Sequence, residues 1–310
     1  MATKHIITAN QFDKNSISKI FSITDKLKSK KTSPKILENK VMATLFYEPS
    51  TRTRLSFESA MQRLGGRVIS TESAAEFSSA SKGETLEDTI RVVNCFSDVI
   101  VLRHFSEGAS EIAARYSKVP IINAGDGKGE HPSQALLDLY TIHSKFKNLK
   151  LTIAMVGDLA NGRTIHSLTY LLSLYKEVNI IYVSPKALSI PQNLKKYIES
   201  KNVTFEETEN LEKALKVSDV IYQTRIQKER FASSKNGSSE SEYLRYFGKY
   251  IIDKNTLKII KKNAIIMHPL PRVNEITADV DDDPRAFYFQ QVQNGLFVRM
   301  ALLAYTFDKA

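Results

Sequence analysis

The chain has 310 residues, of which 42% are hydrophobic and 25% are charged, and its formal net charge is +10. This length is enough for two domains of ordinary size, and the composition excludes a disordered or fibrous protein. No apolar run approaches the ~20 residues of a membrane span, and the first residues lack the pattern of a secretory signal. We therefore expect a cytoplasmic protein without a membrane partner.

Helical and strand patterns alternate along the chain. Apolar residues spaced three to four positions apart predict helices at residues 11–29, 52–65, 85–96, 107–117, 132–146, 162–175, 191–200, 210–217 and 290–308. Short β-rich runs between them predict strands at residues 41–47, 98–103, 119–124, 151–157, 178–183, 203–207, 219–224 and 263–267. This alternation predicts an α/β fold with two doubly wound domains, each a mainly parallel sheet flanked by helices.

A polar stretch at residues 146–150 interrupts these patterns and predicts a domain boundary. We expect a first domain over residues 1–146 and a second over residues 147–289, while the final helix in residues 290–310 could pack on either. In parallel α/β sheets, ligands bind beyond the carboxyl ends of the strands. Polar residues that follow the predicted strands are therefore the candidate binding residues.

The turn between the first predicted strand and the helix that follows it carries the strongest signal in the chain. It contains hydroxyl and guanidinium side chains in a row: Ser50, Thr51, Arg52, Thr53 and Arg54. Free backbone N–H groups, the helix dipole, hydroxyl donors and guanidinium forks all suit a phosphate group. Arginine at a helix start opposes the dipole, so Arg52 and Arg54 suggest a bound anion that offsets this effect. Ordinary helix capping by the hydroxyl groups is the plainer interpretation.

Other polar residues also follow predicted strands. Arginines recur in or beside such turns, at Arg52, Arg54, Arg103, Arg163, Arg225, Arg230 and Arg272. This placement favours small anionic ligands, because nucleic-acid binders more often carry their positive charge in one stripe. His131 precedes a helix start, which favours a neutral imidazole, although a lone histidine is more often structural. Pro269 and Pro271 lack N–H donors, so this turn is rich in carbonyl acceptors, and a cis bond before Pro271 is expected.

Two other motifs point away from redox and nucleotide chemistry. Cys95 is the single cysteine and ends an apolar helical pattern, so we expect a buried structural thiol and no intrachain disulfide. The turn at residues 157–163 lacks the glycine spacing of a dinucleotide site. No histidine or cysteine cluster has metal-ligand spacing. We therefore expect neither a metal nor an organic cofactor.

The segment at residues 46–58, with the later motifs in the same order, resembles the carbamoyl-phosphate signature of the aspartate and ornithine carbamoyltransferase family. The resemblance covers nearly the whole chain and implies that the last helix returns to the first domain. It implies transfer of the carbamoyl group of carbamoyl phosphate to an amine. Two arginine clamps, Arg163 and Arg225, suit the dicarboxylate L-aspartate and hence a step of pyrimidine biosynthesis. The cysteine expected in the ornithine branch is replaced by Pro269.

The resemblance also implies roles for individual residues. The carbamoyl-phosphate site would comprise Ser50, Thr51, Arg52, Thr53, Arg103, His131, Gln134, Pro269 and Leu270, with Ser78 and Lys82 from a neighbouring subunit. The aspartate site would comprise Lys82, Arg163, Arg225, Gln227 and Leu270. The catalytic groups would be Arg52, Thr53, Lys82, Arg103 and His131.

The resemblance bears on partners as well. Family members form trimers, and some join a separate zinc-containing regulatory chain that responds to nucleotides, so a homotrimer with shared sites is expected and an allosteric holoenzyme is allowed. The serine-rich segment at residues 232–242 is predicted to be either a closing lid or a plain surface loop. Two alternative functions stay open on the residues alone. One is a carbamoyltransferase for another amine such as ornithine, and the other is a non-catalytic phosphate-binding or nucleic-acid-binding protein.

Overall fold

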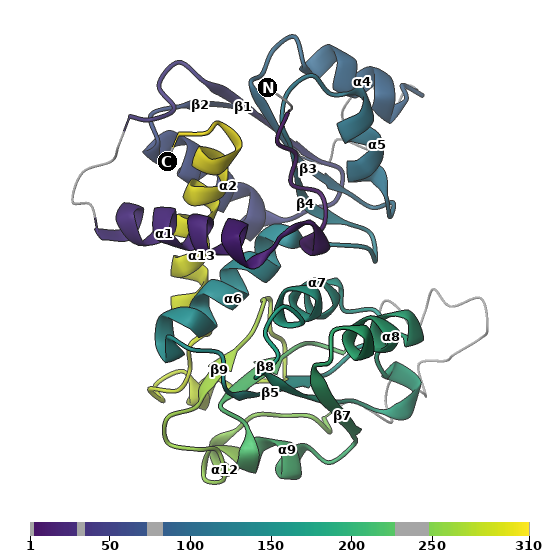
Figure 1. The fold of residues 1–310 in the computed structure, drawn as a ribbon, viewed down its shortest axis with the longest axis vertical. Helices are drawn as coiled ribbons and strands as arrows, with labels where there is room; N and C mark the ends of the chain where they lie inside the picture. The colour runs from purple at the N-terminus through teal and green to yellow at the C-terminus, as the bar shows by residue number, and fades with distance from the viewer. Residues whose placement is uncertain (1–2, 30–34, 73–82, 227–247, 310) are drawn as a thin grey trace. The chain divides into compact units, whose positions relative to one another are not determined.

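The computed structural model describes residues 3–29, 35–72, 83–226 and 248–309. The chain divides into two compact units, the first formed by Met1–Thr141 with Val292–Ala310 and the second by Ile142–Gln291. Each unit contains its own sheet with helices beside it (Figure 1). In the described ranges, no helix is long and apolar enough to cross a membrane.

The first unit is built on a four-stranded sheet in the order β2-β1-β3-β4, with all neighbouring strands parallel. Its strands are β1 (Val41–Phe46), β2 (Arg67–Glu72), β3 (Val99–His104) and β4 (Ile121–Asp126). Side chains on both faces of β1, β3 and β4 are almost all buried, as expected for strands covered by helices on both sides. The strand order reverses between β1 and β3, and ligands of α/β sheets bind in the crevice at such a reversal.

Helices cover both faces of the first sheet (Figure 1). They are α1 (Lys14–Ser29), α2 (Thr51–Arg63), α4 (Leu86–Val93), α5 (Ala109–Tyr116), the first part of α6 (Pro132–Phe146) and the last part of α13 (Tyr288–Thr306), with a short 3-10 helix η1 (Ala9–Gln11). Ala43 and Leu45 of β1 pack in the apolar cluster that contains Ile90 of α4 and Ala113 of α5. Thr44 faces the other way and donates to the Glu58 carboxylate of α2 at 3.0 Å.

The second unit contains a five-stranded sheet in the order β7-β6-β5-β8-β9, again with all neighbours parallel. Its strands are β5 (Thr152–Val156), β6 (Asn179–Val183), β7 (Thr204–Thr208), β8 (Val220–Gln223) and β9 (Ile265–Met267). The order reverses between β5 and β8, so this unit also has a crevice suited to a ligand at its switch point.

Helices lie on both sides of the second sheet, with α7 (Arg163–Leu172) and α8 (Gln192–Ser200) on one side and α9 (Leu211–Val217) and α12 (Lys254–Leu257) on the other (Figure 1). Two short 3-10 helices, η3 (Lys186–Leu188) and η4 (Ala278–Val280), occur in its connections. Ala154 and Val156 of β5 and Ile221 of β8 pack with Leu215 of α9 in one buried apolar cluster.

The predicted α/β fold with two parallel sheets is confirmed, and the differences concern segment ends, the strand β2 and the short helix α12, which was not predicted. β2 was not predicted from the sequence, because it is an edge strand whose side chains are mostly exposed or half-buried. The units divide after Thr141 and after Gln291, a few residues away from the boundaries expected at 146 and 290. The polar stretch at 146–150 coincides with the end of α6, a helix that crosses the division between the two units.

Candidate active site

The turn between β1 and α2 has the properties of an anion-binding helix start. Ser50 occupies the N-cap position of α2, but its side chain makes no capping hydrogen bond. The helical ladder begins with the Arg54 N–H, which donates to the Ser50 carbonyl at 3.1 Å. The N–H groups before it have no partner within the helix, as at any helix start. The Ser50 hydroxyl and these N–H groups are therefore placed to bind an anion, and Thr53 lies buried beside them.

The two arginines of this turn behave differently. The side chain of Arg54 forms ion pairs with Glu58 at 3.5 Å and with Glu72 at 2.7 Å. We expected a bound anion to compensate the positive charge of both arginines at the helix start. This expectation is wrong for Arg54, because the carboxylates of Glu58 and Glu72 already compensate its charge. Arg52 is exposed and makes no ion pair within the described residues, so of the two arginines only Arg52 is left to bind an external anion.

Arg103 lies near the end of β3, on the other side of the β1–β3 crevice. Its guanidinium donates to the carbonyl of Ala124 at 3.2 Å and pairs with the carboxylate of Glu48 at 3.2 Å. Glu48 belongs to the turn after β1, so this ion pair joins that turn to the end of β3 across the crevice. No role for Glu48 was predicted from the sequence, although an acidic residue at a strand end, close to two arginines in the sequence, indicates an ion pair. An anion that binds Arg103 must compete with this carboxylate.

His131 and Gln134 lie at the amino end of α6. His131 directly precedes the helix, is buried, and accepts the Gln134 N–H at its carbonyl at 3.0 Å. The side-chain amide of Gln134 donates from Nε2 to Oδ1 of Asp138 at 2.9 Å. Asp138 was not among the predicted site residues, although a spacing of four residues on a helix predicts its contact with Gln134. The connection from β4 leads into this helix, and β4 lies beside β3 in the sheet.

In the second unit, Arg163 and Arg225 follow the two strands that border the β5–β8 switch point. Arg163 is the first residue of α7, and Arg225 comes two residues after the end of β8. Between the strands the backbones approach closely at Gly157, whose φ is +124°, and an added Cβ there would lie 2.5 Å from the Thr224 carbonyl oxygen. Glycine is required for this approach, since the conformation and the space both exclude a side chain.

The turn after β9 presents carbonyl groups, as predicted. The Leu270–Pro271 peptide is cis. Among the residues that the structure describes, no hydrogen bond is made to the carbonyl of Pro269 or of Leu270. Nδ1 of His268 accepts the Leu270 N–H at 2.7 Å, so the ring proton is on Nε2, which donates to Glu275 at 2.8 Å.

Burial is the largest single influence on the pKa of Glu275 and raises it, but the hydrogen bond and charge of His268 and the backbone N–H donors together outweigh burial, so the net pKa lies below its ordinary value. Glu275 also accepts the backbone N–H groups of Val273 and Asn274, each at 3.1 Å. This buried carboxylate therefore holds both sides of the turn in place and leaves its carbonyls available.

Two expectations about single side chains are wrong. Arg272, counted among the candidate anion ligands, donates to the Asp281 carboxylate and to the Tyr288 hydroxyl. Cys95 was expected to be buried, but it is exposed, because the helix ends at Val93 and the following turn carries the thiol to the surface.

Several predicted site residues lie outside the described residues. These are Ser78, Lys82, Gln227 and Arg230, together with the whole segment 232–242. Their assignments stay predictions. Within the described ranges, no group of three or more histidine, cysteine or acidic side chains could hold a metal ion.

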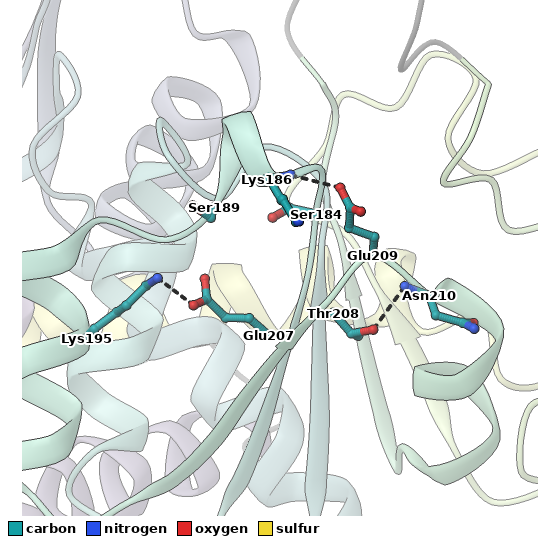
Figure 2. A pocket seen from close by; sticks show the side chains of 8 residues that line it. All are labelled: Ser184, Lys186, Ser189, Lys195, Glu207, Thr208, Glu209 and Asn210. Atoms are coloured by element: carbon teal, nitrogen blue, oxygen red, sulfur yellow. Dashed lines mark hydrogen bonds and ion pairs between the residues drawn. The ribbon is translucent and has the colours of Figure 1, made fainter.

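A cavity of about 570 Å³ opens in the second unit beyond the ends of β6 and β7 (Figure 2). It is lined by Ser184, Lys186, Ser189, Lys195, Glu207, Thr208, Glu209 and Asn210. Lys195 pairs with Glu207 at 2.5 Å, and Glu209 accepts the Lys186 N–H at 3.1 Å. Two lysines face two glutamates, so the lining has no excess of positive charge for an anion. It lies at the β6–β7 side of the sheet, away from the β5–β8 switch point.

Together, the fold and these residues define a two-unit parallel α/β protein with arginine-bearing loops at the switch point of each sheet. Family models agree with this class. Residues 4–144 match the aspartate/ornithine carbamoyltransferase, carbamoyl-P binding domain, and residues 149–306 match the aspartate/ornithine carbamoyltransferase, Asp/Orn binding domain.

Individual relatives extend the match to almost the whole chain. The chloroplastic aspartate carbamoyltransferase of Arabidopsis thaliana is 55% identical over 96% of this chain and 76% of its own length. The catalytic subunit of M. jannaschii aspartate transcarbamoylase is 48% identical, with a TM-score of 0.90 over 98% of both chains. The aspartate transcarbamoylase of Trypanosoma cruzi in complex with carbamoyl aspartate and phosphate is 40% identical, with a TM-score of 0.90 over 97% of this chain and 95% of that one. The chain belongs to the aspartate/ornithine carbamoyltransferase family.

Proposed function

We propose that this chain transfers the carbamoyl group of carbamoyl phosphate to the α-amine of L-aspartate, giving N-carbamoyl-L-aspartate and phosphate. The observation that carries the proposal is the β1–α2 turn, where the Ser50 hydroxyl and Arg52 stand at a helix start beside Arg103. The T. cruzi relative has been solved with the product and phosphate, and another of its structures holds carbamoyl phosphate and aspartate. This reaction is a step of de novo pyrimidine biosynthesis.

In the proposed reaction, the aspartate amine attacks the carbamoyl carbon, the new C–N bond forms, the C–O bond to phosphate breaks, and the amine loses a proton. Charge develops first on the carbamoyl oxygen, near Thr53, Arg103 and His131. It then passes to the leaving phosphate, which is stabilised by Ser50, Thr51, Arg52 and Arg103 and by Ser78 and Lys82 of a neighbouring subunit. Preorganised donors of this kind are usually the largest contribution to catalysis.

The second substrate is selected by charge. Two arginines, Arg163 and Arg225, suit the two carboxylates of aspartate, because a guanidinium binds a carboxylate with two hydrogen bonds. Lys82 and Gln227 complete the aspartate site, and Gln134 holds the carbamoyl amide. The carbonyls of Pro269 and Leu270 accept from the carbamoyl NH2 and the α-amine. Their freedom from hydrogen bonds within the described residues supports this role.

The domains divide this work. Residues 1–146, with the last helix, bind carbamoyl phosphate, and residues 147–289 bind aspartate. The descriptions of the two family models support this division, since they name a carbamoyl-P binding domain and an Asp/Orn binding domain.

The assembly that we propose is a homotrimer with active sites shared between subunits, and a separate zinc-containing regulatory chain is a further candidate partner. Light scattering on the purified protein should give three times the chain mass, and a monomeric mass with full activity contradicts shared sites. We also propose a cytoplasmic location. The plant relatives are named as chloroplastic, so fractionation of the source cells is the deciding measurement.

One assay tests the reaction. Purified protein of known mass should form carbamoyl aspartate from carbamoyl phosphate and aspartate, and should form no citrulline when ornithine replaces aspartate. Citrulline formation would show that the chain acts on ornithine, as in the ornithine branch of the family. Salt-sensitive binding of DNA or RNA without any carbamoyl transfer would favour the non-catalytic alternative.

A further inference from the structure

A group of mostly buried polar side chains is contributed by three helices of the first unit. Asp138 of α6 is 0% exposed, and Arg299 of α13 is 5% exposed. Arg299 donates to the Ser56 hydroxyl of α2 at 2.9 Å, and its guanidinium lies 5.2 Å from the centre of the Phe57 ring. Asp138 accepts the Gln134 amide at 2.9 Å. The charges of Arg299 and Asp138 also interact, so this polar group extends from α2, which follows the β1–α2 turn, to Gln134, the residue expected to hold the carbamoyl amide.

The negative charge of Asp138 stabilises the protonated form of Arg299. Burial lowers the pKa of Arg299 to about 10, and the negative charge of Asp138 opposes that fall, so the guanidinium stays charged at neutral pH. Oδ1 of Asp138 receives the hydrogen bond from Nε2 of Gln134, so this carboxylate acts as the acceptor of the pair.

An acceptor at Asp138 decides which way the Gln134 amide is turned. The NH2 end must face the carboxylate, because the carbonyl end would place two acceptors against each other in a buried site. The carbonyl oxygen of Gln134 is then the end directed away from Asp138. A carbonyl oxygen binds an N–H donor and has no favourable partner in a methyl group.

We propose that Asp138, together with Arg299, is a positioning residue that presents the Gln134 carbonyl to the ligand and so makes the site select a carbamoyl group over an isosteric acetyl group. The inference rests on the proposed role of Gln134. Carbamoyl phosphate and acetyl phosphate differ only by NH2 against CH3, so their ratio of affinities reports the orientation of the amide.

The test compares the binding of carbamoyl phosphate, acetyl phosphate and inorganic phosphate to the full-length protein. In Asp138→Asn, the side chain of residue 138 can either donate or accept a hydrogen bond. The Gln134 amide is then no longer restricted to the orientation in which its NH2 group faces residue 138. The preference for carbamoyl over acetyl phosphate should fall about 5- to 150-fold, the range for leaving a buried acceptor unpaired. The affinity for inorganic phosphate should stay unchanged, because that group binds at the β1–α2 turn.

A matched control separates positioning from general loss of stability. Asp98→Asn removes a carboxylate that pairs with Lys40 at 2.7 Å and accepts the Val41 N–H at 2.9 Å, at the amino ends of β1 and β3. This variant should lower the urea midpoint without changing the preference. If Asp138→Asn does not fold, Asp138→Asn combined with Arg299→Met removes both buried charges at once, which proteins tolerate better than the loss of one partner. The double variant should lose the preference in the same way.

A Gln134→Ala variant distinguishes the two levels of the proposal. If Gln134→Ala abolishes the preference and the Asp138 variants keep it, Gln134 acts without this support and the inference is overturned. If Gln134→Ala leaves the preference intact, the proposed role of Gln134 is itself wrong. An equal loss of affinity for all three ligands in the Asp138 variants would reveal a purely structural role.

Discussion

Replacing Arg52 by alanine should separate catalysis from stability. The side chain is exposed and makes no ion pair within the described residues, so its loss leaves no partner unsatisfied there. Surface changes of this kind usually alter the free energy of unfolding by less than ~0.5 kcal/mol. Removing a cation from a helix start can even stabilise by roughly 0.3–1 kcal/mol. Turnover should nevertheless fall by about 10²–10³, equivalent to ~2.7–4 kcal/mol, the range for one preorganised donor.

Arg54→Ala is the matched control, because it removes the same charge two residues along the same helix. Arg54 contacts Glu58 and Glu72, and its Nη1 donates to the Ser70 hydroxyl at 3.1 Å. Its loss leaves two partly buried carboxylates without their cation, at a cost of roughly 1–2 kcal/mol. The free energy of unfolding should therefore fall, while the turnover of the folded protein stays near that of the parent.

The assay is the initial rate of carbamoyl aspartate formation at saturating concentrations of both substrates, with urea unfolding of each variant in parallel. Near-normal turnover in Arg52→Ala would remove this side chain from the mechanism. Equal losses of rate in Arg52→Ala and Arg54→Ala, in step with equal losses of stability, would show that the turn responds as a structural unit.

Three further measurements bear on the other residues. Arg225→Ala should raise the KM for aspartate far more than that for carbamoyl phosphate, and an equal rise for both contradicts its assignment. Mixing inactive Lys82→Ala and Arg52→Ala subunits should restore part of the activity if sites are shared, so no recovery after proven subunit exchange counts against sharing. Glu275→Gln should lower the urea midpoint more near pH 7 than at about pH 3. The pKa of Glu275 lies below its ordinary 4.5, so the stabilisation by its charged form is present above that value and is lost as the pH falls through the folded-state pKa. A difference that widens on acidification would reverse this sign.

The fold could be predicted from the sequence because helices and strands are encoded by patterns of neighbouring residues. Alternating helical and strand periodicities predicted both parallel sheets, and the rule that ligands bind beyond strand ends pointed to the turns after β1, β3, β5, β8 and β9. The edge strand β2 was not predicted, because an exposed strand that pairs on one side only lacks the apolar run of a buried strand.

The site was harder to predict where a charged side chain forms an ion pair with a residue that is distant in the sequence. Arg54 and Arg52 look equivalent in sequence, and only the fold shows that Glu72 reaches Arg54 from the neighbouring strand. Arg272 likewise pairs with Asp281 across a turn. The contact between Gln134 and Asp138 was predictable from helical spacing, whereas the link to Arg299 depends on the packing of the last helix.

The tight contact at Gly157 also sets a limit on redesign. Side chains such as Arg163 and Arg225 can be exchanged to fit a different amine, since neither requires an unusual backbone angle. Position 157 does not tolerate substitution, because even a methyl group would collide with the Thr224 carbonyl and force the two strand ends apart. Directed evolution toward new acceptors should therefore randomise the arginines and keep this glycine constant.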